Sequence, residues 1–352
     1  MKTTLGAVAH ECRNTWNGDK TGVPVVGLEH LEPGEVILSS WEIDSDNTFT
    51  KKFTKGQVLL GRRRVYLRKA VLAPVDGICS GDITVIEANP DKLLPELLPF
   101  IIQNDAFFNF AMKGSAGSLS PRVKWEHLKD YEISLPTLAE QRKLADRLWA
   151  AYHLKESYKR LLAATDEMVK SQFIEMFKNC REQKSLSDLC DVFMDGDWIE
   201  SKDQSDFGIR LIQTGNVGNG VFKDKGDKAR YISQETFNRL NCTEIYAGDI
   251  LVSRLPDPVG RSCIVPRGLG KCITAVDCTI IRLGATILPE YLICFTKTPA
   301  YTTQIKQFLS GTTRLRVSRA NLGNVIVPVP PIGKQKQFVS VAEQADKSKY
   351  LS

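Results

Sequence analysis

The sequence predicts an α+β protein in which one mixed α/β plan is written twice, with long helices that join the two copies and hold them apart. The first observation is a collinear series of matched segments, most of them 194 positions apart. The second is that both halves contain short β-branched runs bounded by Gly, Pro or Asp, with a helical segment near the end. The third is a stretch of about 42 residues without Gly or Pro, which is typical of one long helix.

The repeat is clearest between "SLPTLAEQRKLADRL" at 134–148 and "PVPPIGKQKQFVSVA" at 328–342. Upstream, "GSLSPRVKWEHL" lies over "GTTRLRVSRANL" and "LPELL" over "LPEYL" at the same offset. After small shifts, "DITVIE" and "GQVLLGR" lie over "DCTIIR" and "GDILVSR". The identical residues include Gly117 and Gly311, Arg122 and Arg316, Pro136 and Pro330, and Gln141 and Gln335. Because the matched blocks keep the same order, we predict a pseudo-two-fold internal repeat.

Each half is predicted to begin with a globular part, at 1–134 and 181–328. The runs "GQVLL", "DITVIEA", "GDILVSR" and "CTIIRL" are predicted strands. The segments "LLPELLPFIIQNDAFFNFAM" and "ILPEYLICFTKTPAYTTQI" are predicted to be helical. The 352 residues are enough for two domains of ordinary size.

A helical spacer is predicted to follow each globular part, at 135–180 and 329–352. The first is free of Gly and Pro from Thr137 to about Lys178, which corresponds to a rod of about 63 Å. Its apolar seam has 3,4 spacing and contains Leu144, Leu148, Ala151, Tyr158, Leu162, Val169 and Met176. The second carries Phe338, Val341 or Ala342, Ala345 and Leu351 on one side. We expect an antiparallel, coiled-coil-like pair; the alternative is an ordinary amphipathic connector.

The second spacer is much shorter than the first. Only about 20 residues follow Pro331, so its helix is expected to be about 30 Å long. We therefore expect either a truncated or split form of the repeat or a sequence that ends early.

Composition places the chain among globular proteins, with 42% hydrophobic and 25% charged residues. The apolar run near the N-terminus is too short for a signal peptide, and none approaches the ~20 residues of a membrane span. Nine cysteines are scattered without a Cys-x-x-Cys pair, so we expect reduced thiols, a cytoplasmic protein, no metal and no cofactor. A formal charge of +6 permits an anionic partner without requiring one.

Basic residues gather at matched places in the two halves. Lys and Arg contact DNA phosphates, and Arg also reads base edges. In a strand or hairpin, Arg62 and Arg64 would face away from Arg63. Two alternatives to DNA contact stay open for these basic clusters. One is a solvated surface, and the other is a turn that only joins the domain to its helix. The candidates lie in "GRRRVYLRK", "GSLSPRVK", "SRLPDPVGRS" and "GTTRLRVSR": Arg62, Arg63, Arg64, Arg68, Lys69, Arg122, Lys124, Arg254, Arg261, Arg314, Arg316 and Arg319.

Catalytic motifs are not found, so no catalytic residue is predicted. The N/D-P-P-aromatic tetrapeptide of amino-methyltransferases is missing. In "DITVIEAN", Asp82 and Glu87 are followed by Asn89 where a carboxylate nuclease needs Lys. The four histidines are isolated in sequence.

Taken together, "LPTLAEQRKLADRL" at 135–148, "VPPIGKQKQF" at 329–338 and the duplicated plan resemble the specificity subunits of type I restriction-modification systems. The resemblance covers essentially the whole chain. It implies two target recognition domains that each read one half of an interrupted site in double-stranded DNA. It also implies a helical ruler that docks two methyltransferase subunits, while restriction subunits join through the complex. The helix residues expected to set the spacing and bind partners are Glu140, Gln141, Leu144, Leu148, Tyr158, Leu162, Val169, Gln335 and Phe338.

Two other functions stay open from the residues alone. A helical scaffold would bind only proteins, and its basic clusters would be solvated surface. A stand-alone DNA enzyme would need a site that the motifs do not supply. The prediction is therefore a non-catalytic DNA-recognition subunit.

Overall fold

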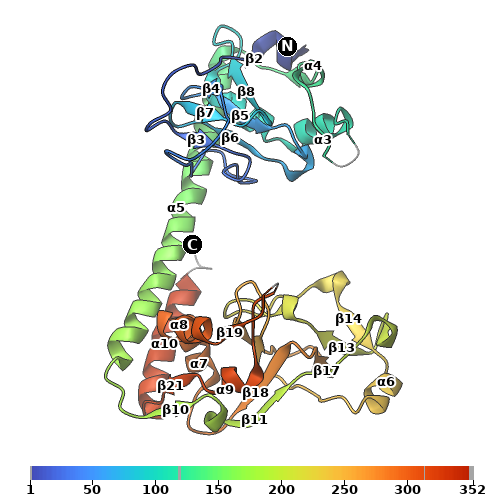
Figure 1. Ribbon diagram of the computed structural model, residues 1–352, viewed down its shortest axis with the longest axis vertical. Coiled ribbons are helices and arrows are strands. Elements are labelled where there is room, and N and C mark those ends of the chain that lie inside the picture. The colour runs from blue at the N-terminus through green and yellow to red at the C-terminus, as the bar shows by residue number, and fades with distance from the viewer. Residues whose placement is uncertain (1, 118–119, 313, 349–352) are drawn as a thin grey trace. The chain divides into compact units, whose positions relative to one another are not determined.

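The computed structural model describes residues 2–117, 120–312 and 314–348 (Figure 1). The chain divides into two compact units, Met1–Lys159 (unit 1) and Arg160–Ser352 (unit 2), and helix α5 (Leu138–Phe177) contributes to both. Each unit combines sheets with helices, as the α+β prediction requires. No helix in the described part of the chain is long and apolar enough to span a membrane.

Unit 1 has a central antiparallel sheet with the order β2–β8–β5–β6: β2 (Ala9–Cys12), β8 (Ile83–Ala88), β5 (Val58–Gly61) and β6 (Ala70–Leu72). An outer sheet has the order β3–β7–β4: β3 (Val25–Val26), β7 (Gly77–Cys79) and β4 (Lys51–Phe53). Strand β1 (Lys2–Thr4) pairs with β9 (Glu132–Ser134). The helical segments are α1 (Leu5–Val8), η1 (Val65–Leu67), η2 (Pro95–Leu97), α2 (Leu98–Ile102), α3 (Asp105–Lys113) and α4 (Trp125–Leu128).

Unit 2 repeats this plan with the central order β11–β18–β15–β16: β11 (Cys190–Asp195), β18 (Cys278–Leu283), β15 (Ile250–Ser253) and β16 (Ser262–Ile264). Its outer sheet has the order β12–β14–β13–β17: β12 (Gln204–Ser205), β14 (Arg230–Ile232), β13 (Ile209–Ile212) and β17 (Cys272–Thr274). The pairs are β10 (Gln183–Ser185) with β21 (Ile326–Pro328) and β19 (Leu309–Ser310) with β20 (Arg316–Val317). The helical segments are η3 (Ser187–Leu189), η4 (Ser201–Asp203), η5 (Thr214–Asn216), η6 (Gly226–Lys228), α6 (Gln234–Arg239), α7 (Pro289–Thr296), α8 (Pro299–Gln307), α9 (Arg319–Gly323) and α10 (Ile332–Ser348).

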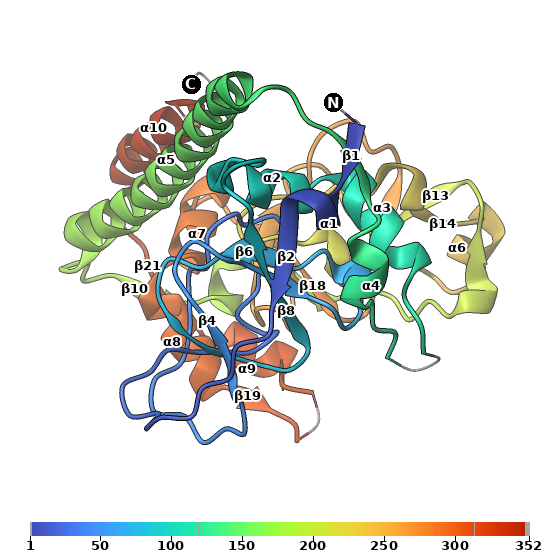
Figure 2. The same cartoon turned by 90° about the horizontal axis from the view of Figure 1, so that it is seen from above.

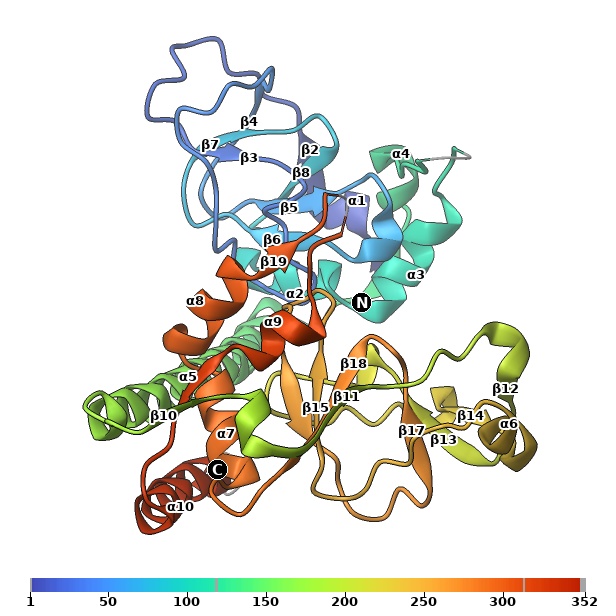
Figure 3. The same ribbon diagram turned by 60° about the horizontal axis from the view of Figure 1, so that its bottom comes forward.

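The inner strands β5 and β15 of the central sheets are buried on both faces, which explains their unbroken apolar runs. In β5, Val58 and Leu60 join the core that contains α2 and α3, whereas Leu59 joins the core shared with the outer sheet. In β15, Ile250 and Val252 join the core that contains α7 and α8, whereas Leu251 joins the core shared with the outer sheet. Figure 3 shows α7 and α8 on one side of β15 and β18, with β13, β14 and β17 on the other.

The outer sheets differ between the units. In both, one pair of strands is parallel, β3 with β7 and β13 with β17. In unit 1 the antiparallel neighbour is β4, which pairs with β7. In unit 2 it is β14, which pairs with β13. The central sheet is therefore the repeated part of the fold, and the outer sheet is where the copies diverge.

The repeated glutamine is an internal structural residue in both units. Gln141 is 1% exposed and Gln335 is 0% exposed. The Gln141 amide accepts a hydrogen bond from Leu94 N (2.9 Å) and donates to the carbonyls of Lys92 and Pro136 (3.1 Å each). The partners of Gln335 are the residues 194 positions further on: Leu288 N, Thr286 O and Pro330 O, at 2.9, 3.0 and 2.7 Å. These bonds tie the first turn of each long helix to the "LPE" segment, so neither glutamine is available to a partner protein.

The long central helix is confirmed over 40 residues. Thr137 and Glu140 form its capping box, in which Thr137 N donates to Glu140 Oε2 (3.0 Å) and Glu140 N donates to Thr137 Oγ1 (3.4 Å). Glu140 therefore stabilises the helix start. Of the predicted seam, Leu144, Tyr158 and Leu162 are 43%, 37% and 39% exposed, whereas Leu148 and Val169 are partly buried against their unit's core.

Helix α10 runs antiparallel to the last turns of α5 (Figures 1 and 2). The ring of Phe338, near the start of α10, lies 5.2 Å from Phe173 and 5.7 Å from Phe177. Further along α10, Ala342 lines a pocket together with Val169. Phe338 is 0% exposed, so it holds unit 2 together and is withdrawn from the partner surface. Of the alternatives on the apolar face, Ala342 is buried and Val341 is exposed, while Leu351 lies outside the described residues.

Candidate nucleic-acid interface

The two basic clusters of unit 1, about 60 residues apart in sequence, meet at one place in the fold. Arg62 N donates to Asp82 O (2.9 Å), and Val123 N donates to Arg62 O (3.0 Å). Arg63 and Arg122 form an isolated antiparallel bridge. Backbone hydrogen bonds of Arg62, Asp82 and Val123 therefore hold together the end of β5, the start of β8 and the segment before α4. We call this arrangement the backbone frame.

Asp82 organises the guanidinium groups on this frame. Arg122 Nε and Nη2 donate to its two carboxylate oxygens at 2.7 and 3.2 Å, and Arg63 Nη1 lies 3.7 Å away. The hydrogen bonds from Arg122 lower the pKa of Asp82. Arg63 also donates from Nε to Ser120 Oγ (2.6 Å). Because both arginine side chains are still more than 40% exposed, the cluster presents oriented positive charge to solvent.

The expected hairpin is present, because residues 62–69 join the antiparallel strands β5 and β6, but the expected alternation of Arg62, Arg63 and Arg64 within it is wrong. Strand β5 ends at Gly61, and the chain turns through η1, with Arg64 and Arg68 on either side at φ of 51° and 54°. This left-handed conformation breaks the alternation on which the facing prediction rested. Arg64 is exposed, as is Lys124 on the neighbouring segment.

Three other candidates of unit 1 have internal partners. Arg68 pairs with Asp105 on α3. Lys69 is half-buried and donates to Leu28 O at 2.7 Å. Arg62 is half-buried and supplies the backbone frame. Arg62 and Lys69 are therefore turned toward the loop, whereas Arg68 stays exposed although it is paired with Asp105.

Unit 2 repeats the backbone frame at matched residues. Arg254 N donates to Asp277 O (2.9 Å), and Val317 N donates to Arg254 O (3.3 Å). Gly117 and Gly311 precede the matched segments with φ of 119° and 109°, a conformation that L side chains rarely adopt. A Cβ at Gly311 would also lie 2.5 Å from the carbonyl oxygen of Arg314. The repeated glycine is thus explained by backbone geometry.

Arg261 is turned inward and does not face solvent as predicted. Its Nε donates to Val217 O at 2.7 Å, and Nη2 donates to Thr214 O at 2.9 Å. Nη1 donates to Leu255 O (2.8 Å) and Pro258 O (3.0 Å). Burial lowers the pKa of this guanidinium. With four backbone carbonyls as acceptors, Arg261 braces the 255–258 loop and has little capacity left for DNA.

Arg254 is internal as well. Its Nη2 donates to Val276 O (2.8 Å), its Nε lies 3.3 Å from Asp195 Oδ1, and the side chain is 12% exposed. Sequence reasoning placed it on the surface because a charge run does not reveal which members are turned inward.

Arg314, Arg316 and Arg319 are exposed, and none forms an ion pair with a described residue. Arg316 lies in β20, and Arg319 opens α9 after the Ser318 cap. Sequence reasoning missed Lys306 of α8, which is exposed and lines a hollow together with Leu315. Lys306 lies outside the quoted basic cluster, so only the fold brings it beside that segment.

One group of side chains in the described residues has the composition of a metal site: His10, Cys12 and Glu87, whose ligand atoms lie within 4.8 Å of one another. All three already have hydrogen-bond partners, and His10 Nε2 lies 3.8 Å from Cys12 Sγ. The Cys12 thiol donates to Glu87 Oε2 (3.2 Å), and the Gln57 amide donates to the same oxygen (2.7 Å). Burial, followed by Glu87, raises the pKa of Cys12 to about 12, so the thiol keeps its proton. All nine cysteines lie in the described part of the chain and are free thiols.

The fold and the duplicated frame agree with a comparison against protein families. The family described as "Type I restriction modification DNA specificity domain" matches residues 12–163 and 181–350. The two matched segments cover most of the chain, one in each half. The chain therefore belongs to this family.

Curated relatives are similar over most of the chain or over part of it. The type I restriction enzyme EcoBI specificity subunit of Escherichia coli is 24% identical over 372 aligned residues, which cover 94% of this chain and 74% of that protein. The EcoDI specificity subunit of Escherichia coli is 27% identical over 97 residues, 28% of this chain and 21% of that protein.

Solved structures share the fold. A chain from a study of complex assembly and conformational transition of the type I R-M system has a TM-score of 0.53 at 20% identity, covering 100% of this chain and 91% of that chain. The type I restriction-modification S subunit of M. genitalium has a TM-score of 0.55 at 12% identity, with 100% and 90% covered. At these identities the likeness concerns the fold alone.

Proposed function

We propose that the chain is the DNA sequence-specificity subunit of a type I restriction-modification complex, and that each unit reads one part of a bipartite site. Family membership supports a role in DNA recognition. The observation that carries the two-part reading is the backbone frame made by Arg62, Asp82 and Val123 and repeated by Arg254, Asp277 and Val317. Each frame holds a segment with exposed arginines, and DNA reading by two related domains needs such a surface in both.

The proposed contacts follow from exposure. In unit 1 they are made by Arg63, Arg64, Arg122 and Lys124, and in unit 2 by Arg314, Arg316 and Arg319. Lysine and arginine neutralise phosphates, and a guanidinium can also bind the O6 and N7 atoms of guanine. Arg62, Lys69, Arg254 and Arg261 are proposed to shape the loops from within, and Arg68, which is exposed but paired with Asp105, is proposed to orient the loop of unit 1.

Partner proteins are proposed to supply the chemistry. Two modification subunits would methylate the DNA, and restriction subunits would cleave it. The globular parts 1–134 and 181–328 would read DNA, and the helical segments 135–180 and 329–352 would set the spacing. Exposed apolar residues of α5, Leu144, Tyr158 and Leu162, are candidates for partner contacts.

The test begins by mapping adenine methylation in host DNA with and without the gene, which yields the candidate site. Binding of the chain with its modification subunits is then measured by gel shift over a range of salt concentrations. Arg314→Gln with Arg316→Gln should weaken binding about 10-fold and flatten the salt dependence by about one unit per lost phosphate contact. Arg63→Gln with Arg64→Gln should affect the other half of the site. Arg181→Gln, an exposed arginine between α5 and β10, is the matched control.

The same measurements separate this function from that of a protein-only scaffold. A scaffold keeps its partners when the arginines are changed and shows no preference among duplexes. Equal affinity for all duplexes at physiological salt contradicts the proposal.

A further inference from the structure

Three side chains with metal-binding atoms meet where β2 pairs with β8 in unit 1. His10 and Cys12 are two positions apart on β2, so both side chains point to the same face of the sheet. Glu87 of β8 lies opposite His10 in the antiparallel register. The nitrogen, sulfur and carboxylate oxygen atoms of the three side chains lie within 4.8 Å of one another. Glu87 follows Cys12 by 75 positions in sequence, so only strand pairing brings the three together.

The distances between these atoms are close to those around a single tetrahedral metal ion. Cys12 Sγ lies 3.8 Å from His10 Nε2 and 3.2 Å from Glu87 Oε2. Zinc bonds of about 2.3 Å to sulfur and about 2.0 Å to nitrogen or oxygen place such ligand atoms about 3.5 Å apart. The two observed distances lie on either side of this value. Small side-chain adjustments therefore bring the three ligands onto one ion.

A buried amide orients two of these ligands. Gln57 is 5% exposed, and its Nε2 donates to Glu87 Oε2 at 2.7 Å and to Cys12 Sγ at 3.3 Å. Hydrogen bonds of this kind hold the ligands of a metal site in place. Glu87 is exposed, although β8 is buried at its other five positions. Packing alone therefore does not account for a carboxylate at this point of the strand.

The matched place in unit 2 carries a positive charge. Glu87 of "DITVIE" corresponds to Arg282 of "DCTIIR" in the overlay of the two halves. Gln57 of "GQVLLGR" corresponds in the same way to Asp249 of "GDILVSR". Arg282 donates from Nε and Nη2 to the two carboxylate oxygens of Asp249, at 2.8 and 2.7 Å. Unit 1 thus has a carboxylate where unit 2 has a cation paired with one, and a bound metal ion would supply the positive charge.

Lys51 does not supply this charge. It lies near enough to Cys12 to act on the thiol electrostatically. However, its ammonium group is paired with Glu11, with Nζ 3.4 Å from Oε1. The hydrogen bonds to Glu87 Oε2 come instead from the uncharged side chains of Gln57 and Cys12.

We propose that His10, Cys12 and Glu87 bind one divalent transition-metal ion, for which zinc is the best match. Thiolate, imidazole and carboxylate are the ligands that zinc takes, whereas magnesium and calcium take oxygen ligands. One thiolate and one carboxylate together balance the charge of a divalent ion. His10 and Glu87 are exposed, so the fourth position of the ion is open to water.

Binding replaces the proton that the Cys12 thiol carries in the free chain. The S–H bond breaks, the sulfur keeps the electron pair and bonds to the metal ion, and the proton passes to solvent. The hydrogen bond from the thiol to Glu87 is lost, and both groups then share the ion.

The probe is cobalt(II), added to the full chain after metals have been removed with a chelator. Cobalt bound to a thiolate gives a charge-transfer absorption in the near ultraviolet, which reports the bond to Cys12. We expect one cobalt ion per chain, a dissociation constant below about 10 µM, and displacement of the cobalt by zinc.

Substitutions identify the ligands. His10→Gln and Glu87→Gln each remove one ligand at an exposed position and should weaken cobalt binding at least about 10-fold. Cys12→Ser should abolish the charge-transfer absorption. Cys79→Ser is the matched control for a buried thiol of the same core, and His153→Gln for an exposed histidine. Both controls lie outside the cluster and should bind cobalt like wild type.

Hydrogen exchange measures the effect of zinc on the fold. Zinc that binds only the folded unit should slow exchange in β2 and β8 by up to about 100-fold at 100 times its dissociation constant. This slowing should disappear in His10→Gln. Thermal melts without metal check that each variant stays folded.

Three results overturn the proposal. They are absence of the charge-transfer absorption, its persistence in Cys12→Ser, and a cobalt affinity that neither His10→Gln nor Glu87→Gln changes. The experiment uses no DNA and alters none of the arginines of the proposed DNA contacts. Its outcome is therefore independent of the proposed function, and either can fail without the other.

Discussion

Units 1 and 2 share a backbone frame but use its charged side chains differently. In unit 1, the Asp82 carboxylate binds Arg122 and lies near Arg63. In unit 2, the matched Asp277 forms no ion pair with a described residue, and Arg316 is likewise unpaired there. The positions of main-chain atoms are thus preserved where side-chain partners have changed. This combination of a constant frame and variable side chains agrees with the proposal that the two units read different DNA sequences.

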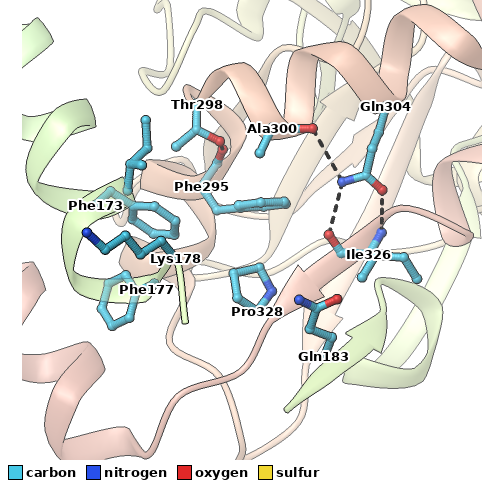
Figure 4. A pocket seen from close by; sticks show the side chains of 11 residues that line it. Phe173, Phe177, Lys178, Gln183, Phe295, Thr298, Ala300, Gln304, Ile326 and Pro328 are labelled. Carbon is cyan, nitrogen blue, oxygen red and sulfur yellow. Dashed lines mark hydrogen bonds between the residues drawn. The ribbon is translucent and has the colours of Figure 1, made fainter. Parts of the chain in front are cut away.

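The surface beside α5 shows the same contrast in packing. In unit 2 the rings of Phe173 and Phe177 pack at this place against Tyr291 and leave a hollow of about 400 Å³ beside them (Figure 4). In unit 1 the residue matched to Tyr291 is Leu97, which lines a hollow of about 500 Å³. Duplication reproduces a surface, and the surroundings decide how much of that surface is covered.

The largest expected effect comes from breaking what the units share. Gln141→Ala and Gln335→Ala should each destabilise their own unit by about 2–4 kcal/mol, because each leaves three buried backbone groups without a partner. Hydrogen exchange in β5 and β15 reports the two units separately. Gln172→Ala, an exposed glutamine on α5, should be nearly neutral. If one substitution reduced hydrogen-exchange protection equally in both units, the two glutamines would not stabilise their units independently.

The next effect sharpens a difference between the units. Arg261→Lys should destabilise unit 2 by about 2 kcal/mol, because an ammonium group cannot reach all four carbonyls that the guanidinium binds. Thermal unfolding and exchange in the 255–258 loop measure the loss. Arg316→Lys keeps the charge at an exposed site and should leave stability unchanged.

A smaller effect is expected from Asp82, the carboxylate that pairs with arginines of both basic clusters of unit 1. Asp82→Asn should raise DNA affinity about 3-fold at low salt, since Arg63 and Arg122 become free for phosphate. Asp277→Asn should change it less. The pKa of Asp82 is lowered in the folded chain, so its stabilising contribution is present above its ordinary value of 3.8 and is lost as the pH falls below it. Acid titration of unfolding should therefore show wild type and Asp82→Asn converging at low pH.

The smallest effect concerns the left-handed turn of unit 1. Arg64→Gly should leave stability unchanged or raise it by up to about 1 kcal/mol, because glycine accepts a positive φ without strain. DNA affinity should nevertheless fall about 3-fold if Arg64 contacts phosphate. Arg64→Lys should keep most of the affinity. A glycine variant that binds DNA like wild type would remove Arg64 from the proposed interface.

Sequence patterns were reliable where one local rule applied. The long helix was predictable because Gly and Pro are missing from it, and β5 and β15 because their apolar runs are short and β-branched. The arginines were harder, because a run of charges does not show which ones point inward. Arg261 is oriented by carbonyls at Thr214, Val217, Leu255 and Pro258, and the first two of these lie more than 40 residues away in sequence.

The sequence by itself determined the duplication, the central strands β5, β8, β15 and β18, the long helices and the family resemblance, because these depend on residue order and local periodicity. Only the tertiary structure decided the roles of the repeated residues. Gln141 and Gln335 are buried, and each joins the start of a long helix to its own unit by hydrogen bonds. Gly117 and Gly311 permit a left-handed turn. The hollow beside α5 in unit 1 also became visible only in three dimensions, because burial depends on which distant segments meet, and residue order alone does not specify that.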